Sequence, residues 1–297
     1  MNGKEFRGPL AVAIMGIVPW TLVTAFWLFK TWTADSFDNW VQFAVFGVAS
    51  ILCLGAISIP PPWIYGTHVI LALRNIVVIA LLVSLIRVWP ENPSLLTLLS
   101  LIIAAGGLVI AVRFAARSTA DEVLDLHHPV PATLIANQAG RFGNHHKSAI
   151  EQRWAADLSA LGPGNRRASP IWSSRVDDYA IFGLPVHAPC DGVVVDCADG
   201  RPDNIDLNEV PRYTDGRGNF IAIATDGATV ILAHLKLDSV VVEIGDPVSV
   251  GQILARVGNS GRTSEPHLHL HCEADGKGVP FTINGQRLFR GVRLRQR

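Results

Sequence analysis

The chain has 297 residues, which is long enough for two domains. It carries 25 Lys and Arg against 25 Asp and Glu, so its formal net charge is zero at pH 7. This balance excludes the strongly basic surface that nucleic-acid binding requires, and we expect no nucleic-acid partner. Charged residues are sparse before Thr119 and frequent after it, so the two parts of the chain belong to different structural classes.

The first part contains four long apolar stretches. Each approaches the roughly 20 helical residues that are needed to cross the hydrocarbon core of a bilayer. The stretches are Leu10–Phe29, Val41–Ile59, Val69–Val88 and Leu95–Val112. The sequence therefore predicts an all-α membrane domain of about four transmembrane helices at residues 1–117, with the lipid bilayer as its partner and a multi-pass location in the cell membrane.

A linker at 118–134 and a mainly β domain at 135–297 are predicted next. The β domain is indicated by short runs of β-branched and apolar residues that alternate with turn residues, a spacing typical of an antiparallel sandwich or barrel. The runs are GVVVDC at 192, NFIAIAT at 219, ATVILAH at 228, SVVVEIG at 239, QILARVG at 252 and PHLHLHCE at 266. A short helix is expected within Ala149–Leu161.

The last of these runs places three histidines, His267, His269 and His271, at every second position. Side chains on a strand alternate between its faces, so the three imidazoles project to one side, and the leucines between them project to the other. A polar edge strand rich in histidine remains one interpretation. A catalytic zinc site is the other, and it needs three protein ligands, so further ligands must come from elsewhere in the chain.

Candidates for the missing groups lie upstream. His145 and His146 are followed by Asp157 in the segment NHHKSAIEQRWAADL, and His234 ends the strand-like run ATVILAH. A lone histidine such as His234 is more often structural than catalytic, so the spacing alone leaves its role open.

Four segments of the second part resemble zinc metallopeptidases of the M23 (lysostaphin/LytM-like) family. PVHAPCDGVVV resembles the entry strand of that family, and ILAHL resembles its Y-A-H-L motif. GDPVSVGQILARVGNSGRTSEPHLHLHCE resembles G-D-x-V-x-x-G-Q followed by G-x-S-G-x-[ST]-x-x-P-H-L-H. The resemblance covers about half of the chain, and it implies a duplicated hybrid β motif and one Zn²⁺ per domain.

The resemblance also implies roles for individual residues. In the P-H-L-H motif, His269 is a zinc ligand and His267 belongs to a catalytic pair with His234. The family's H-x-x-x-D motif is absent, but Gln152 to Asp157 match a variant tail, Q-R-[YFW]-A-x-D. This variant implies His146, in preference to His145, and Asp157 as the remaining ligands.

Two further histidines fall outside the family's set of ligands. We expect His271 to support the metal site or to line the substrate groove. His187 replaces an aromatic residue of the entry motif, and we expect it to pack within the domain.

The predicted function is that of a membrane-anchored zinc metalloendopeptidase, a hydrolase that cleaves peptide bonds in peptidoglycan stem peptides or cross-bridges. The main alternative is a non-catalytic M23-like binding or activator module for cell-wall hydrolases. A lipoyl-type or phosphotransferase carrier shares the strand pattern, but no lysine lies at the expected hairpin tip, and the H-x-H pair with its upstream Asp has no use in a phosphocarrier. The sequence names no protein partner.

The side of the membrane on which the β domain lies is a separate question. The positive-inside rule weakly favours the cytoplasm, because Lys4, Arg7, Arg113 and Arg117 lie on its side of the predicted spans against Lys30 and Arg87 on the other. A cell-wall substrate requires the opposite placement, and we expect an extracytoplasmic β domain.

Overall fold

The structure is a computed structural model that describes residues 9–57, 68–89, 124–140, 145–171, 173–208 and 216–296, with scattered positions between 94 and 106. The chain divides into two compact units. One unit covers Ile14–Pro61 and Thr67–Thr119, and the larger part of the other is Ala120–Arg297.

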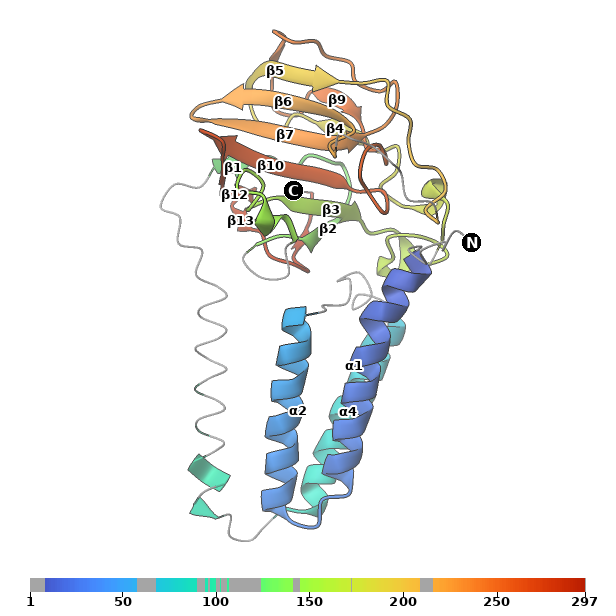
Figure 1. Ribbon diagram of the computed structural model, residues 1–297, viewed down its shortest axis with the longest axis vertical. Helices are drawn as coiled ribbons and strands as arrows, with labels where there is room; N and C mark the ends of the chain where they lie inside the picture. Colours follow the sequence, from blue (N-terminus) through green and yellow to red (C-terminus); the bar gives the residue numbers. More distant parts are fainter. Residues whose placement is uncertain are drawn as a thin grey trace, which may run out of the picture. The chain divides into compact units, whose positions relative to one another are not determined.

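Three long helices belong to the first part of the chain. They are α1 (Pro9–Trp32), α2 (Phe37–Ile57) and α4 (His68–Arg87), as Figure 1 shows. Polar groups join their ends: Trp40 Nε1 donates to Ser84 Oγ at 2.9 Å, and Arg87 donates to the carbonyl oxygen of Ala34 at 2.6 Å.

The prediction of an all-α membrane domain with four transmembrane helices is wrong. Over the described residues, no helix combines the length and the apolarity that are needed to cross a membrane. Polar residues lie within the apolar runs on which the prediction rested, with Gln42 near the start of α2 and Ser84 within α4. Of the fourth predicted stretch, Leu95–Val112, the structure describes only six scattered residues, and the other twelve lie outside the described residues.

From Leu124 onward the described chain is mainly β, with three short 3₁₀ helices. These helices are η1 (His145–Ser148), η2 (Pro163–Asn165) and η3 (Val176–Asp178). The strands are β1 (Leu124–Leu126), β2 (Leu134–Gln138), β3 (Ala156–Ala160), β4 (Pro185–His187), β5 (Gly192–Ala198), β6 (Asn219–Thr225), β7 (Ala228–Leu235), β8 (Pro247–Val248), β9 (Ile253–Arg256), β10 (Leu268–Ala274), β11 (Lys277–Val279), β12 (Phe281–Ile283), β13 (Gln286–Arg287) and β14 (Arg293–Leu294).

The largest sheet has the strand order β14-β2-β3-β10-β7-β6-β5-β8, and β11 pairs with β10 beside it. Every pairing within this sheet is antiparallel. A second sheet has the order β1-β12-β13, and β4 pairs with β9. The central position of β10, between β3 and β7, is visible in Figure 1 and places its histidines in the middle of the sheet.

Alternation of side chains along β10 explains its burial. Leu268, Leu270 and Cys272 are fully buried in the main hydrophobic core, as the sequence predicts. The opposite face of the same sheet carries a smaller apolar cluster that includes Phe220 and Ile231. Both faces of the central strands are therefore occupied, one by the core and the other by the floor of the histidine site.

Two expected elements differ from the structure. The helix expected within Ala149–Leu161 is a turn followed by β3, because ADLSA pairs with β2 on one side and β10 on the other. The run SVVVEIG at 239 forms no strand, and Val241 and Ile244 are exposed there.

Candidate metal and catalytic site

A carboxylate and an imidazole from strands far apart in the sequence face each other at the centre of the site. Asp157 on β3 lies directly opposite His269 on β10 in the antiparallel register. Side chains of such pairs have their Cβ atoms about 5 Å apart, so the register alone brings them together. His269 Nδ1 lies 3.0 Å from Asp157 Oδ1, and both residues are at most 5 % exposed.

His146 approaches the same carboxylate from η1. Its Nε2 lies 3.0 Å from both Asp157 Oδ1 and Oδ2. His145 precedes it and is exposed, with its ring centroid 3.9 Å from that of His146. Donor atoms of His145, His146 and Asp157 lie within 4.8 Å of one another and form a group that could hold a metal ion.

His234 enters the site through a β-bulge near the end of β7. Asn219 pairs with Leu235 and Phe220 pairs with Ala233, so His234 is the extra residue between these two pairs. Its φ of 62° is in the left-handed region, which is uncommon for a residue with a side chain. A bulge redirects a side chain, and here the imidazole faces His267 with ring centroids 4.7 Å apart.

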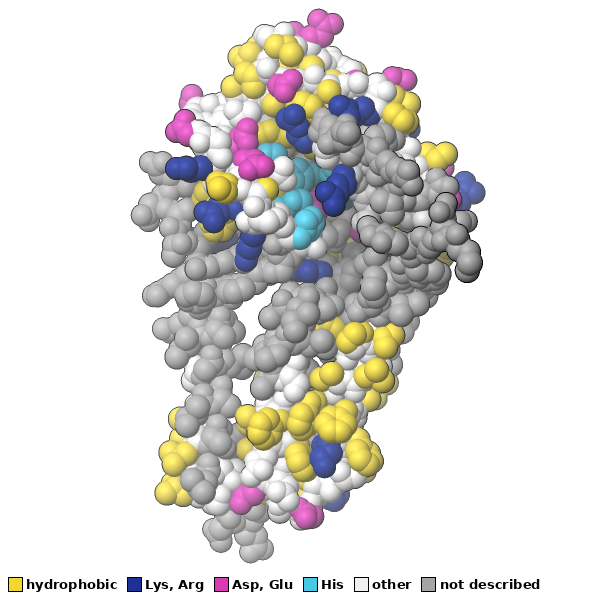
Figure 2. Space-filling view, viewed as in Figure 1, with side chains coloured by type: hydrophobic (Ala, Val, Ile, Leu, Met, Phe, Trp, Pro, Cys, Tyr) yellow, Lys and Arg dark blue, Asp and Glu magenta, His cyan; other side chains and the backbone are white. Residues whose placement is uncertain are grey.

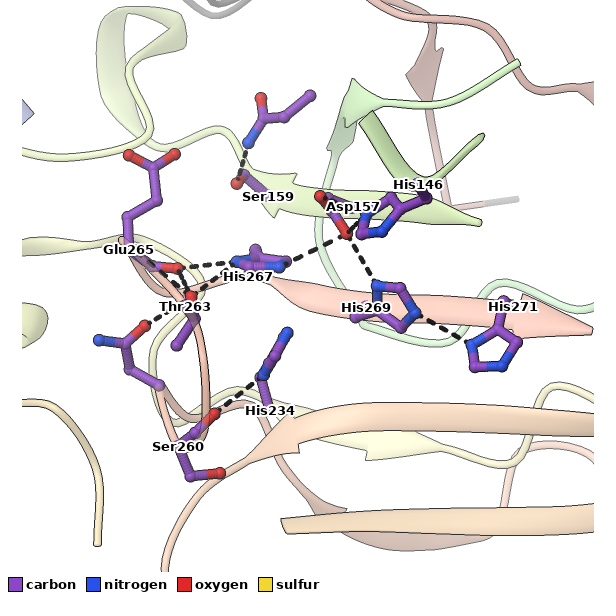
Figure 3. A network of polar contacts seen from close by, with 12 residues as sticks. His146, Asp157, Ser159, His234, Ser260, Thr263, Glu265, His267, His269 and His271 are labelled. Carbon is purple, nitrogen blue, oxygen red and sulfur yellow. Dashed lines mark hydrogen bonds and ion pairs between the residues drawn. The ribbon is translucent and has the colours of Figure 1, made fainter. Parts of the chain in front are cut away.

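Carbonyl acceptors fix the tautomers of His234 and His267. His234 Nδ1 donates to the carbonyl oxygen of Ser260 at 2.9 Å, and His267 Nδ1 donates to that of Glu265 at 2.8 Å (Figure 3). A carbonyl oxygen only accepts, so Nδ1 carries the proton in both rings. Each neutral ring therefore has its lone pair on Nε2, and His267 Nε2 lies 3.5 Å from Asp157 Oδ1.

Burial and charge shift these groups in different directions. Burial raises the pKa of Asp157, but the adjacent His267, His146 and His269 outweigh it and hold that pKa well below its usual range. Burial lowers the pKa of His234, and the nearby His267 lowers it further. For His267, the Asp157 carboxylate overcomes the effect of burial and raises the pKa.

His271 continues the chain of imidazoles along β10. Its Nδ1 lies 3.0 Å from His269 Nε2, and its Nε2 lies 3.8 Å from a carboxylate oxygen of Glu273. Burial, together with the neighbouring His269, lowers the pKa of His271 to about 3, so its ring is neutral and its Nδ1 can accept a hydrogen bond from His269 Nε2. This contact leaves His269 Nδ1 as the nitrogen that faces Asp157.

The structure thus brings all five predicted site residues into one cluster. Figure 3 shows His146 and His269 directed at Asp157, with His234 and His267 beside them. Two imidazoles and one carboxylate make a donor set typical of catalytic zinc sites, which leave a fourth position for water. His187 belongs to β4, which pairs with β9, and it does not line the groove at the site.

Three supporting residues were assigned no role from the sequence. Thr263 Oγ1 donates to the Glu265 carbonyl at 2.8 Å, and the Glu265 carboxylate forms an ion pair with buried Arg167. Thr263 and Glu265 immediately precede the P-H-L-H motif, so their proximity to it was a usable signal. Arg167 is almost a hundred residues away in the sequence, in a segment without a recognisable motif, and no signal pointed to it.

Residues 175–281 match the model of peptidase family M23. The match covers 107 of the 297 residues, so the similarity belongs to one part of the chain, the M23-like domain. His146 and Asp157 lie before the matched residues, whereas His234, His267 and His269 lie within them.

Curated relatives of this M23 domain include two peptidoglycan DD-endopeptidases of Vibrio cholerae serotype O1. ShyA is 30% identical over 135 residues, which cover 44% of this chain and 27% of the relative. ShyC is 31% identical over 116 residues, which cover 37% of this chain and 23% of the relative. The chain thus spans about a quarter of the length of these relatives.

Solved structures with a similar domain include the antimicrobial peptidase lysostaphin from Staphylococcus simulans. It is 28% identical to this chain, and the match covers 32% of this chain and 34% of lysostaphin with a TM-score of 0.25. A zinc-containing peptidase from Vibrio cholerae is 19% identical, and the match covers 52% of this chain and 35% of that peptidase with a TM-score of 0.29.

Proposed function

We propose that the M23 domain is a zinc metalloendopeptidase that hydrolyses peptide bonds in peptidoglycan stem peptides or cross-bridges. The observation that carries this proposal is the buried Asp157 carboxylate, which meets His146 and His269 at 3.0 Å beside two further histidines. The names of the relatives from Vibrio cholerae support peptidoglycan as the substrate.

His146, Asp157 and His269 fit a zinc ion by the chemistry of their donor atoms. Asp157 is 5 % exposed and kept in its charged form by the imidazoles around it, so it is a buried anion suited to a cation. Zinc bound by these residues supplies a Lewis acid and lowers the pKa of a water molecule towards neutrality.

His234 and His267 then supply the proton transfer that peptide hydrolysis requires. Their Nδ1 protons are committed to the carbonyls of Ser260 and Glu265, so Nε2 of each ring is the atom that exchanges a proton. A ring that accepts a proton at Nε2 can return it to the leaving amine, and the protonated ring can donate a hydrogen bond to a developing oxyanion.

Replacement of His269 tests this proposal directly. We expect the full-length His269→Ala protein to lose bound zinc and hydrolysis of purified peptidoglycan, measured by metal analysis and by mass spectrometry of released peptides. His127→Ala is the matched control, because His127 is exposed and does not line the groove at the site. Undiminished hydrolysis by His269→Ala would contradict the assignment, and a zinc-free wild-type protein would favour a binding module instead.

The proposed substrate also requires a location. Peptidoglycan lies outside the cytoplasmic membrane, so we propose that the M23 domain is extracytoplasmic. The test is a fusion of the carboxyl end to a reporter enzyme that functions only outside the cytoplasm, and we expect this fusion to show reporter activity. Activity of a reporter that functions only in the cytoplasm would refute a cell-wall substrate.

A further inference from the structure

A groove of about 730 Å³ crosses the histidine site. Ile231 and Ala233 of β7 and His269 and His271 of β10 contribute to its lining from adjacent strands of the sheet. The apolar part of this floor suits a peptide backbone. The lining also includes two acidic and two basic side chains, and the two signs of charge come from opposite ends of the groove.

The acidic end lies at the carboxyl end of β10. Glu273 is on β10 itself, and Glu151 lines the groove from the turn that precedes β3. That turn is held in place there, because Gly278 on the adjoining β11 donates its N–H to the carbonyl oxygen of Ile150 at 2.9 Å. Glu151 and Glu273 therefore form one acidic end of the groove.

The basic end lies at the amino end of β10. Arg262 comes from the loop that leads into β10 and lines both the groove and the smaller pocket beside His267. Arg217 lines the groove just before β6, with its guanidinium 4.0 Å from the centre of the Phe220 ring. Stacking on an aromatic ring fixes the plane of a guanidinium, which suits it to bind a carboxylate.

Close packing holds the backbones of both arginines next to the bulge that carries His234. The N–H of Arg262 donates to the carbonyl oxygen of Gly216 at 3.0 Å. The N–H of His234 donates to the carbonyl oxygen of Arg217 at 3.0 Å. Gly218 and Gly261 both have positive φ, and a Cβ on either would lie 2.4 Å from backbone atoms of the other loop. The loops that carry Arg217 and Arg262 thus pack against each other and against the bulge that carries His234.

Figure 2 shows the resulting arrangement on the surface. Acidic side chains border the histidines on one side, and Lys or Arg side chains border them on the other. Along β10, the six-residue step from His267 to Glu273 corresponds to about 20 Å at the rise of a strand. An extended peptide of about six residues spans this length.

We propose that the groove selects peptides that carry a carboxylate and a free ammonium group on opposite sides of the scissile bond. Arg262 and Arg217 bind the carboxylate, and Glu151 with Glu273 binds the ammonium group. This inference rests on the proposed peptidase function and adds the direction in which the peptide lies, with its carboxylate near the amino end of β10.

Chemically modified substrates test each end of the groove separately. The probe is a purified cross-linked muropeptide in three forms: unmodified, with its free amines acetylated, and with its carboxylates converted to methyl amides. Wild-type full-length protein is expected to cleave either modified form at least about tenfold less efficiently, by kcat/KM, because a charge-assisted hydrogen bond is lost.

Charge-neutral variants identify which end of the groove binds the carboxylate and which end binds the ammonium group. Arg262→Gln is expected to cleave the unmodified and methyl-amide forms equally well while still discriminating against acetylation, and Glu151→Gln is expected to show the reverse pattern. Arg175→Gln, an exposed arginine that does not line the groove, is the control and should discriminate as the wild type does. A variant that slows all three forms by one common factor would overturn the proposal, as would a wild type that cleaves them equally.

Binding separates this inference from the proposed function. Calorimetry of the three forms with His267→Ala, in which a proposed catalytic group is absent, gives the same comparison without turnover. Stronger binding of the unmodified form supports the charged groove even where the wild type hydrolyses nothing, which would refute only the peptidase function. Equal affinities for all three forms would refute the groove assignment.

Discussion

Arg167 and Glu265 form an ion pair beneath the turn that positions His267. The Arg167 side chain is 2% exposed and that of Glu265 is 20% exposed, and the guanidinium also lies 4.9 Å from the Tyr179 ring. Removal of one partner from a buried pair costs about 3–5 kcal/mol, because the remaining charge stays buried without compensation. Since Glu265 retains some contact with water, we expect Glu265→Ala to cost about 3 kcal/mol.

A double substitution separates the cost of the buried charge from other effects. Arg167→Met with Glu265→Gln removes both charges, and we expect this variant to lie within about 1 kcal/mol of the wild type. The free energy of opening can be measured on the full chain by hydrogen exchange of β10 peptides at increasing urea concentration. A cost below about 1 kcal/mol for Glu265→Ala would refute the interpretation of Arg167 as a buried, charge-dependent support.

Three further outcomes follow from the site. His146→Ala should abolish zinc binding measured by equilibrium dialysis, whereas His145→Ala should retain it, and the opposite result would exchange their roles. His271→Phe should weaken zinc binding about tenfold by removing the acceptor for His269 Nε2, and an unchanged dissociation constant would argue against that contact. At pH 8, iodoacetamide should alkylate half-buried Cys197 before Cys190. Burial raises the pKa of both thiols, but Cys190 is buried and its pKa rises further, to about 11; mass spectrometry showing the reverse order would contradict the structure.

The sequence was informative where a local pattern coincided with the final environment. The alternation along Leu268–Cys272 assigned one face of β10 to the core and the other to the histidines, and the structure has both faces as predicted. The A-H-L segment located His234, but the bulge that turns its side chain depends on pairing with β6 and could not be seen in the segment itself.

Other elements were mispredicted because tertiary pairing overrides local preference. ADLSA at 156–160 contains no β-branched residue and favours a helix locally, yet its pairing between β2 and β10 makes it a strand and brings Asp157 opposite His269. SVVVEIG has strong strand preference but forms no strand, although the Val241 N–H donates to the carbonyl oxygen of Leu254 on β9. Hydropathy alone likewise overestimated the apolar length of the N-terminal helices.

The bulge at His234 makes the site depend on the exact number of residues in one strand. Without this single residue, β6 and β7 could pair without interruption from Thr225 to Asn219, and the sheet would be more regular. A left-handed backbone costs about 1–3 kcal/mol for a residue with a side chain, and the deletion would remove this cost. A one-residue deletion in β7 is therefore a short evolutionary route from the proposed hydrolase to a stable domain of the same fold that retains the proposed metal ligands but lacks one of the two proposed proton-transfer groups.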